Sequence, residues 1–192
     1  MSLRQAIFST FKEIFQTALI SLGIFFFVYI FLVQPHRVKG DSMVPNFADG
    51  ELILTEKISY RFFKPERGDV IVFKSPTAKN ADFIKRIIAL PGENVKIENG
   101  SISVNGQKLT EDYIKVPTEG NFSRIVSSNE YFVLGDNRHS SFDSRVFGNI
   151  KKETILGKAW LVYWPILESK KSEGIRLVSR AHYSISNSFD NR

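Results

Sequence analysis

The sequence contains no cysteine and only three histidines among its 192 residues. The lack of cysteine excludes disulfide bridges, thiol catalysis and cysteine-rich zinc sites. None of the histidines, His36, His139 and His182, stands in an obvious Ser-His-Asp setting. A serine that acted as a nucleophile in this chain would therefore need another base. No residue pattern calls for a metal or a cofactor, and we expect neither.

Basic residues outnumber acidic ones, 26 against 20, which gives a net charge of +6. Such a charge suits a protein that binds nucleic acid or one that lies beside anionic lipid head groups. No segment fits a DNA-binding domain, so we expect a membrane neighbour and no nucleic-acid partner. Hydrophobic residues make up 43% of the chain, which is enough for a buried core.

Residues 15–33 form a run of nineteen residues without a formal charge. A helix of this length, at about 1.5 Å per residue, nearly crosses a hydrocarbon core of about 30 Å. A buried core helix would keep a polar stripe, which residues 22–33 lack, and a cleavable secretory signal would end in an Ala-x-Ala site, which does not follow. We therefore expect a retained single anchor in a lipid bilayer. Positive charges flank the run almost equally, so they do not settle its orientation.

After residue 36 the pattern changes to short strands separated by turn residues. Strands rich in β-branched and aromatic residues are expected at 51–56, 69–74, 83–90, 131–135 and 158–166. Two Asn-Gly pairs within residues 95–109 predict tight hairpins. We predict a mainly β domain at 36–168 and a polar tail at 169–192. In the tail, residues 175–178 can pack, whereas the last ten are expected not to.

Two stretches carry polar side chains that suit a site. GDSMVP (40–45) places Ser42 in a turn just beyond the apolar run. GDNRHSSFDSR (135–145) is rich in residues whose side chains hydrogen-bond to each other and to the backbone. Taken alone it would fit a solvated turn. The apolar YFVL before it anchors the loop to the core, which favours a rigid loop at a site.

The predicted strand at 83–90 supplies a candidate base. Strand alternation puts Phe83, Lys85 and Ile87 on one face. A lysine among apolar neighbours loses solvation in its charged form, so its pKa falls and its neutral amine can act as a general base near pH 7. Alternatively, Lys85 lies on an edge strand and extends to water. Its neighbour Arg86 is expected to be solvated or ion-paired.

The order of these motifs resembles that of bacterial type I signal peptidases, the membrane-bound enzymes that remove signal peptides. A hydrophobic anchor is followed in the family's order by GDSMVP (40–45), RGDVIVF (67–73), KRIIALPGE (85–93), GDNRHSSFDSR (135–145) and ILGKA (155–159). The resemblance covers roughly residues 15–165. It implies an antiparallel β catalytic domain of the signal-peptidase type on one N-terminal transmembrane helix.

The resemblance implies a role for each matching residue. Ser42 would be the nucleophile and Lys85 its general base. Ser141 would orient the lysine, and Met43 would line the substrate cleft unless it simply packs in the core. Many members have a serine or threonine at the position of Gly40, whose hydroxyl helps to bind the oxyanion. Gly40 offers none, so the Ser42 backbone N–H and a second backbone or water donor are expected to take this role.

Four residues of the last motif are implied to support the site rather than to react. Asp143 and Arg145 match an ion pair, and Asp136 and Asn137 are expected to hold the same loop. Asn46 replaces a threonine that is frequent in the family, which is a milder change. The region between the lysine motif and the last motif is short, which implies little of the second domain found in larger members.

On this resemblance we expect a serine endopeptidase that cleaves N-terminal signal peptides from secreted preproteins through an acyl-enzyme. Its substrates would carry small residues, usually Ala, at the first and third positions before the cut. The site would lie at the outer face of the cytoplasmic membrane, which leaves residues 1–14 as a short cytoplasmic segment. Two alternatives stay open: a related Ser-Lys maturation peptidase with other substrates, and a non-catalytic membrane-anchored β domain that only binds partners.

Overall fold

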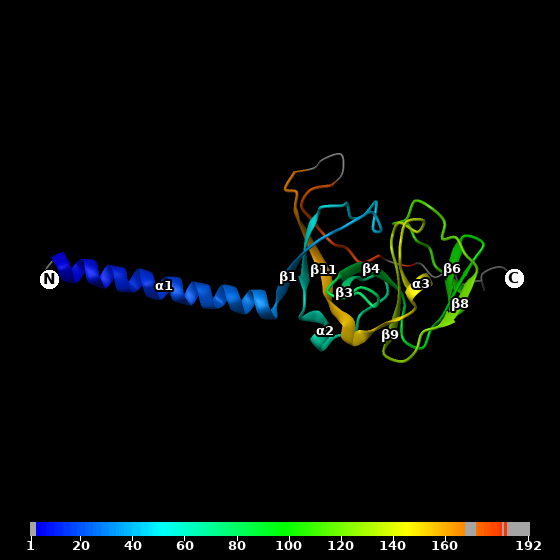
Figure 1. The fold of residues 1–192 in the computed structure, drawn as a ribbon, viewed down its shortest axis with the longest axis horizontal. Coiled ribbons are helices and arrows are strands. Elements are labelled where there is room, and N and C mark those ends of the chain that lie inside the picture. Colours follow the sequence, from blue (N-terminus) through cyan, green and yellow to red (C-terminus); the bar gives the residue numbers. More distant parts are fainter. Residues whose placement is uncertain (1–2, 168–171, 182, 184–192) are drawn as a thin grey trace.

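The computed structural model describes residues 3–167, 172–181 and 183 (Figure 1). Its first element, α1 (Leu3–Phe31), is an uninterrupted helix of 29 residues that extends away from a β domain (Figure 1). The window Thr10–Tyr29 is long and apolar enough to cross a membrane, and none of it is buried within the molecule. The alternative of a buried core helix is therefore wrong.

Most of the β domain is one eight-stranded antiparallel sheet, which confirms the predicted mainly β fold. Its strands are, in spatial order, β1 (Val33–Arg37), β2 (Leu52–Glu56), β11 (Ile155–Trp164), β3 (Val70–Lys74), β4 (Asp82–Ala89), β9 (Glu130–Leu134) and β10 (Ile150–Lys151), with β12 (Arg176–Leu177) paired to β11. The five strands expected from the sequence correspond to β2, β3, β4, β9 and β11. Three short helical turns connect strands: α2 (Ser59–Phe62), α3 (Ser144–Phe147) and a 3-10 turn at Lys152–Thr154.

The part of the chain that connects β4 to β9 forms a second, four-stranded sheet. Its strands are, in spatial order, β7 (Gln107–Lys108), β6 (Ser101–Val104), β5 (Asn94–Glu98) and β8 (Phe122–Ile125). The two predicted Asn-Gly hairpins join β5 to β6 and β6 to β7, and both residues of each pair have positive φ, as tight hairpin turns require. The short region between the lysine motif and the last motif, which was expected to hold little of a second domain, thus forms one small sheet.

Apolar side chains from these strands form three buried clusters. The Phe132 cluster joins the two sheets. The Met43 cluster joins the segment after β1 to β2, β3 and β11, and the Phe73 cluster lies mainly on β3, β4 and β9. Full burial of one such side chain stabilises the fold by about 1.5–3 kcal/mol. The clusters therefore fix the strands and turns that carry the polar residues of the site.

The C-terminal segment packs on the sheet as far as it is described. β12 pairs with β11 and Val178 packs against a core cluster, so the predicted packing of residues 175–178 is confirmed for the strand and for Val178. The side chains of Ile175 and Leu177 are exposed, so the prediction is wrong for them. Tyr183 also packs, with its hydroxyl 2.8 Å from that of Tyr113. The expectation that the last ten residues do not pack is therefore wrong at Tyr183, because its ring finds a partner in the fold. The other nine, 184–192, lie outside the described residues.

Candidate active site

Ser42 stands in a tight turn that follows β1 and begins at Gly40. Gly40 has a φ of +78°, a conformation that favours glycine, and its N–H donates to the Asp49 carboxylate at 2.7 Å. The N–H of Phe47 donates to the Met43 carbonyl at 2.9 Å. Met43 is fully buried, which pins the turn to the core and leaves Ser42 only partly buried. The Met43 side chain thus packs in the core, which agrees with the alternative that it has a packing role.

Lys85 lies on β4 with its amine directed at Ser42, so the two residues predicted to react are brought together. Lys85 Nζ donates to Ser42 Oγ at 2.7 Å and to the Ile84 carbonyl at 2.9 Å. The lysine is only 4% exposed, and its Nζ lies 5.7 Å from the centre of the Phe83 ring. β4 is an inner strand between β3 and β9. The alternative of an edge lysine that extends to water is therefore wrong.

Burial lowers the pKa of Lys85 to about 8. The nearby carboxylates of Asp143 and Asp136 oppose this shift, because their negative charge favours the ammonium form. Near pH 7 on the order of one tenth of the amine is then neutral, against fewer than about one in a thousand for an ordinary lysine. A neutral amine at hydrogen-bond distance from a hydroxyl can accept its proton, so the pair is competent as base and nucleophile.

Asp143 is fully buried and organises the last motif. Its carboxylate accepts hydrogen bonds from Arg145 Nε at 2.8 Å and Nη2 at 2.9 Å, which forms the ion pair that was predicted. It also accepts the N–H of Gly135 at 3.1 Å and that of Arg145 at 3.2 Å, and so caps α3. Arg145 donates in addition to the Arg138 carbonyl at 2.7 Å. The motif is therefore a fixed loop, and the alternative of a solvated turn is wrong.

Asp136 and Arg86 form a buried ion pair beside the turn. Arg86 Nε and Nη2 donate to the two carboxylate oxygens at 2.8 and 2.7 Å. Asn46 Nδ2 donates to the same carboxylate at 2.8 Å and to the Tyr113 carbonyl at 2.9 Å. An amide supplies two donors where a threonine hydroxyl supplies one. Asn46, which the sequence marked only as a departure, thus ties the Ser42 turn to the last motif.

Asn137 holds the same turn through two backbone groups. Its N–H donates to the Ser42 carbonyl at 3.0 Å, and its Nδ2 donates to the Asp41 carbonyl at 3.0 Å. Both bonds fix backbone next to the Ser42 side chain. Asn137 thus connects the last motif to the backbone of the Ser42 turn.

Ser141 lies beside the Ser42 turn, but its hydroxyl has no hydrogen-bond partner among the described residues. The Oγ is buried against Gly135. The described residues thus include no bond from Ser141 to Lys85, and its role in orienting the lysine stays a prediction. A buried hydroxyl without a protein partner is uncommon in a folded protein.

A cleft of about 790 Å³ opens over Ser42 and Lys85. Its walls come from β1 and the segment after it, from β4 and from the last motif, and they include Val38, Gly40, Asp41, Ile53, Phe83, Ile84, Ser140 and Phe142. Gly40 therefore lies in the cleft wall, and its part in binding the oxyanion stays a prediction. The Ser42 N–H has no acceptor among the described residues, so it is available to stabilise an oxyanion.

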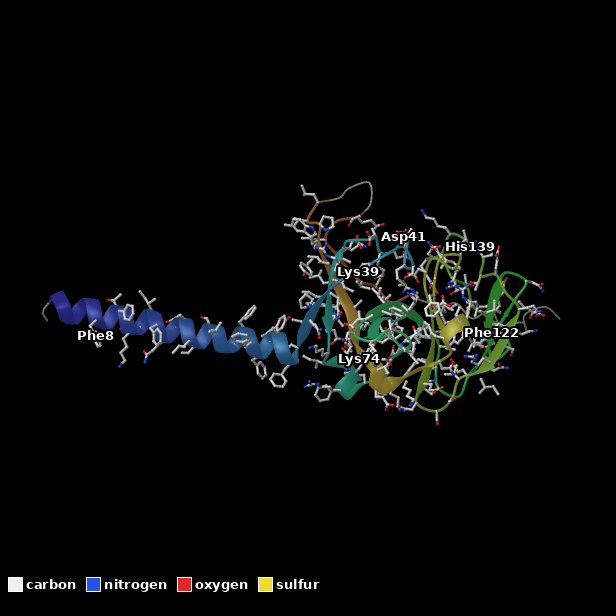
Figure 2. The ribbon with its side chains drawn as sticks, viewed as in Figure 1. Phe8, Lys39, Asp41, Lys74, Phe122 and His139 are labelled. Atoms are coloured by element: carbon white, nitrogen blue, oxygen red, sulfur yellow. The ribbon has the colours of Figure 1, made fainter. Side chains whose placement is uncertain are left out.

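Neither of the two described histidines makes a hydrogen bond to Ser42. His139 is at the surface of its loop (Figure 2), 3.8 Å from the Glu119 carboxylate. His36 lies in the cleft wall, 3.5 Å from the Asp82 carboxylate, and burial lowers its pKa. No local pattern indicates that His36 lines the cleft, because its place there depends on how β1 pairs with β2. His182 lies outside the described residues.

Glu51 and Arg176 form a buried ion pair behind the turn, which the sequence analysis did not predict. Glu51 is 1% exposed and accepts hydrogen bonds from Arg176 Nη1 and Nη2 at 2.8 Å each. It also accepts the N–H of Ala48 at 3.2 Å. Arg176 Nη2 donates in addition to the Asn46 carbonyl at 2.6 Å. Glu51 and Arg176 are 125 positions apart, so no local pattern indicates their contact.

A serine that faces a buried lysine in the cleft of a β domain suits a serine peptidase, and comparison with known proteins identifies the family. The model of the signal peptidase family, peptidase S26, matches residues 11–164. The chain therefore belongs to this family of serine endopeptidases, hydrolases that process signal peptides. The family resemblance of the motifs is thus confirmed, and the apolar N-terminal helix fits a membrane-anchored protein.

Several relatives carry the name signal peptidase I. The chain is 35% identical over 164 residues to the probable signal peptidase I-2 of Synechocystis sp., which covers 82% of this chain and 75% of that protein. It is 35% identical over 170 residues to signal peptidase IB of Staphylococcus aureus, which covers 79% of this chain and 88% of that protein. A crystal structure of a signal peptidase I from Enterococcus faecalis matches 50% of this chain and 97% of its own, with a TM-score of 0.47 and 35% identity.

Proposed function

We propose that the chain is a membrane-anchored signal peptidase I that works through a Ser42-Lys85 dyad. The observation that carries the proposal is the 2.7 Å hydrogen bond between Ser42 Oγ and the buried amine of Lys85. Ser42 attacks the scissile carbonyl while the neutral amine takes its proton. The resulting ammonium protonates the leaving amine, so the peptide bond breaks and an acyl-enzyme forms. Lys85, neutral again, activates a water that hydrolyses the ester and restores Ser42.

Negative charge develops on the carbonyl oxygen of the substrate in both steps. The Ser42 N–H stabilises this oxyanion, and a second backbone or water donor replaces the hydroxyl that Gly40 lacks. Ser141 orients the amine of Lys85 during proton transfer. The support for this arrangement is the position of Gly40 and Ser42 in one cleft and the buried hydroxyl of Ser141 next to the turn.

The substrate is the signal peptide of a secreted preprotein with small residues at the first and third positions before the cut. The cleft walls include Val38, Ile53 and Ile84. These apolar side chains suit a methyl group and offer no partner to a buried charge. A charged or bulky residue at the third position is therefore refused, at a cost of several kcal/mol.

The helix α1 crosses the bilayer once, with residues 1–14 on the cytoplasmic side and the cleft at the outer face of the cytoplasmic membrane. Support comes from the apolar window of 20 residues and from the direct passage of α1 into β1, which forms part of the cleft wall. A signal peptide lies in the same bilayer with its own apolar segment. Its cleavage site then emerges where β1 begins.

The dyad is tested with Ser42→Ala in the full chain, using a preprotein substrate. Processing should fall below about 1% of the parent rate, while thermal unfolding is unchanged, because a methyl group cannot attack a carbonyl. Ser123→Ala, on the second sheet, is the matched control and should keep parent activity. Residual processing above that level would remove Ser42 from the role of nucleophile.

The substrate class is tested separately with two preproteins that differ at the third position before the cut. The parent enzyme should cleave the one with Ala and refuse the one with Asp. Equal cleavage of both would contradict the substrate assignment and favour a maturation peptidase of other specificity. It would leave the dyad untouched.

A further inference from the structure

The short helix α2 and the residue that follows it present two phenylalanines to solvent. Phe62 is 75% exposed and Phe63 is 70% exposed. On the inner side, the Tyr60 hydroxyl donates to the Asp69 carboxylate at 2.9 Å, and the Tyr60 ring packs against the Phe73 cluster. The aromatic pair is therefore directed outward by a fixed element, which is the usual mark of a contact surface.

The position of α2 is tied to the end of α1. The N–H of Lys57 donates to the Leu32 carbonyl at 2.9 Å, so the segment that leads into α2 meets the chain where it leaves α1. Figure 1 shows α2 on the side of the β domain that faces this helix end. The Glu56 carboxylate accepts the N–H groups of Ile58 and Ser59 at 3.1 and 2.9 Å and fixes the entry to the turn. Any membrane around α1 therefore has its surface close to α2.

Basic side chains lie next to the two phenylalanines in sequence and in a hollow that adjoins α2. Arg61 and Lys64 are exposed and flank them in sequence. A hollow of about 270 Å³ adjoins α2, with Lys57, Arg61 and Lys152 in its walls, and no acidic side chain is found among the described residues that line it. Aromatic rings beside basic groups suit the boundary between hydrocarbon and anionic head groups.

We propose that α2 and the adjoining basic hollow form a membrane-docking surface whose partner is the surface of an anionic lipid bilayer. Phe62 and Phe63 enter the upper part of the acyl chains, and Arg61 and Lys152 face lipid phosphates. The inference rests on the proposed function in one respect, which is that α1 lies in the membrane. One helix alone leaves the β domain free to turn about the helix axis. A second contact at α2 fixes this rotation and so sets how the cleft faces the bilayer.

The absence of cysteine allows a direct test in the full chain. Phe62→Cys is labelled with a nitroxide and the protein is reconstituted into vesicles of phosphatidylglycerol and phosphatidylcholine. Oxygen, which concentrates in lipid, should relax the label more than a water-soluble nickel chelate does. The matched control is Ile125→Cys on β8, 68% exposed and on the second sheet, where the reverse is expected. Equal access of the nickel chelate to both labels would overturn the proposal.

The charge requirement is tested with the same label. In vesicles of phosphatidylcholine alone, the label at position 62 should become more accessible to the nickel chelate, because the attraction of the basic groups is lost. Arg61→Glu together with Lys152→Glu should produce the same change in the anionic vesicles. If neither change alters the label, the basic hollow takes no part in docking and the choice of an anionic surface is wrong.

Cleavage assays separate docking from catalysis. Phe62→Ser with Phe63→Ser should slow cleavage of a preprotein embedded in vesicles by about 3- to 30-fold and leave cleavage of a short peptide in detergent within about twofold of the parent. Ile125→Ser should change neither rate. Equal loss on both substrates, or no loss on either, would overturn the proposal. Ser42→Ala loses both activities, so a failure of the proposed catalytic function is recognised separately.

Discussion

Gly135 lies directly against Ser141, so closely that a side chain at Gly135 would overlap both the Ser141 hydroxyl and the Ser42 carbonyl oxygen. Gly135 is also held from the other side, because its N–H donates to the buried Asp143 carboxylate at 3.1 Å. The lack of a side chain at this position is what allows the last motif to approach the Ser42 turn.

Gly135→Ala should therefore lower the cleavage rate by about 100-fold, the scale expected when a reacting group is displaced by about 1 Å. The added methyl should also lower the free energy of unfolding by about 1–3 kcal/mol through overpacking. Steady-state kinetics on a signal-derived peptide and denaturant unfolding would measure the two effects. Gly23→Ala on α1 is the control, since nothing lies within 4 Å of the added methyl there. Parent activity in Gly135→Ala would show that the loop has room to move.

Ser141→Ala should slow cleavage by roughly 10- to 1,000-fold, because the lysine loses an orienting partner. The free energy of unfolding should change little, since the hydroxyl has no hydrogen-bond partner among the described residues to lose. The kcat should fall while KM stays near the parent value, which a general loss of folded protein would not produce. Activity close to that of the parent would leave Ser141 without its assigned role.

Activity should rise with pH through about 8, the lowered pKa of Lys85, because only the neutral amine can accept the Ser42 proton. It should be weak near pH 5. Lys85→Met removes the amine and Lys85→Arg keeps it charged, so both should be inactive. A histidine would also produce a rise with pH. His139→Asn and His36→Asn are therefore the controls, because His36 lies in the cleft wall. Loss of the titration in either variant, with activity retained in Lys85→Met, would assign the base to that histidine.

Lys85→Met should also stabilise the protein near pH 7. The pKa of Lys85 in the fold lies below its ordinary value of 10.5, so the fold disfavours the ammonium form. This costs about 3 kcal/mol near pH 7, and the cost disappears as the pH rises to the ordinary value. The variant should therefore gain up to about 3 kcal/mol of unfolding free energy near pH 7 and much less near pH 10. An equal gain at both pH values would contradict a buried, charge-disfavouring site.

Arg176→Gln should lower the free energy of unfolding by about 3–5 kcal/mol, because it leaves the buried Glu51 carboxylate without its cation. Adding Glu51→Gln should restore part of the loss, since the buried charge is then gone as well. The control is Glu173→Gln, a carboxylate 76% exposed and 3.6 Å from the same arginine, which should change stability by less than about 1 kcal/mol. Chemical denaturation near pH 7 compares the three. A stable Arg176→Gln would show that the pair does not hold the turn.

The parts of the site that sequence reasoning found are those with local signals. Strand alternation placed Lys85 on an apolar face, because a period of two residues depends only on neighbours along the chain. The Asn-Gly hairpins were found for the same reason. The membrane-spanning length of α1 can likewise be predicted from its apolar run alone, without knowledge of the fold. The roles within the last motif came from the family resemblance. The structure supplies contacts for Asp136, Asn137 and Asp143, but none from Ser141 to Lys85 among the described residues.

The parts that were missed depend on contacts between distant segments. Asn46 reaches Asp136 across 90 positions, and no property of an Asn after a proline indicates that partner. The burial of Met43 depends on where the turn falls on the sheet, so the choice between cleft and core required the fold. The packing of Tyr183 depends in the same way on Tyr113, which lies 70 positions away.

Arg176 leaves the ribosome 125 residues after Glu51. Ser42 and Lys85, only 43 residues apart, have both been synthesised long before that. While the C-terminal segment is missing, the Glu51 carboxylate stays hydrated and the Asn46 carbonyl lacks its arginine donor. The turn that carries Ser42 is thus supported by Arg176 only after that residue has been synthesised, so a nascent chain that stops before Arg176 lacks these contacts behind the turn.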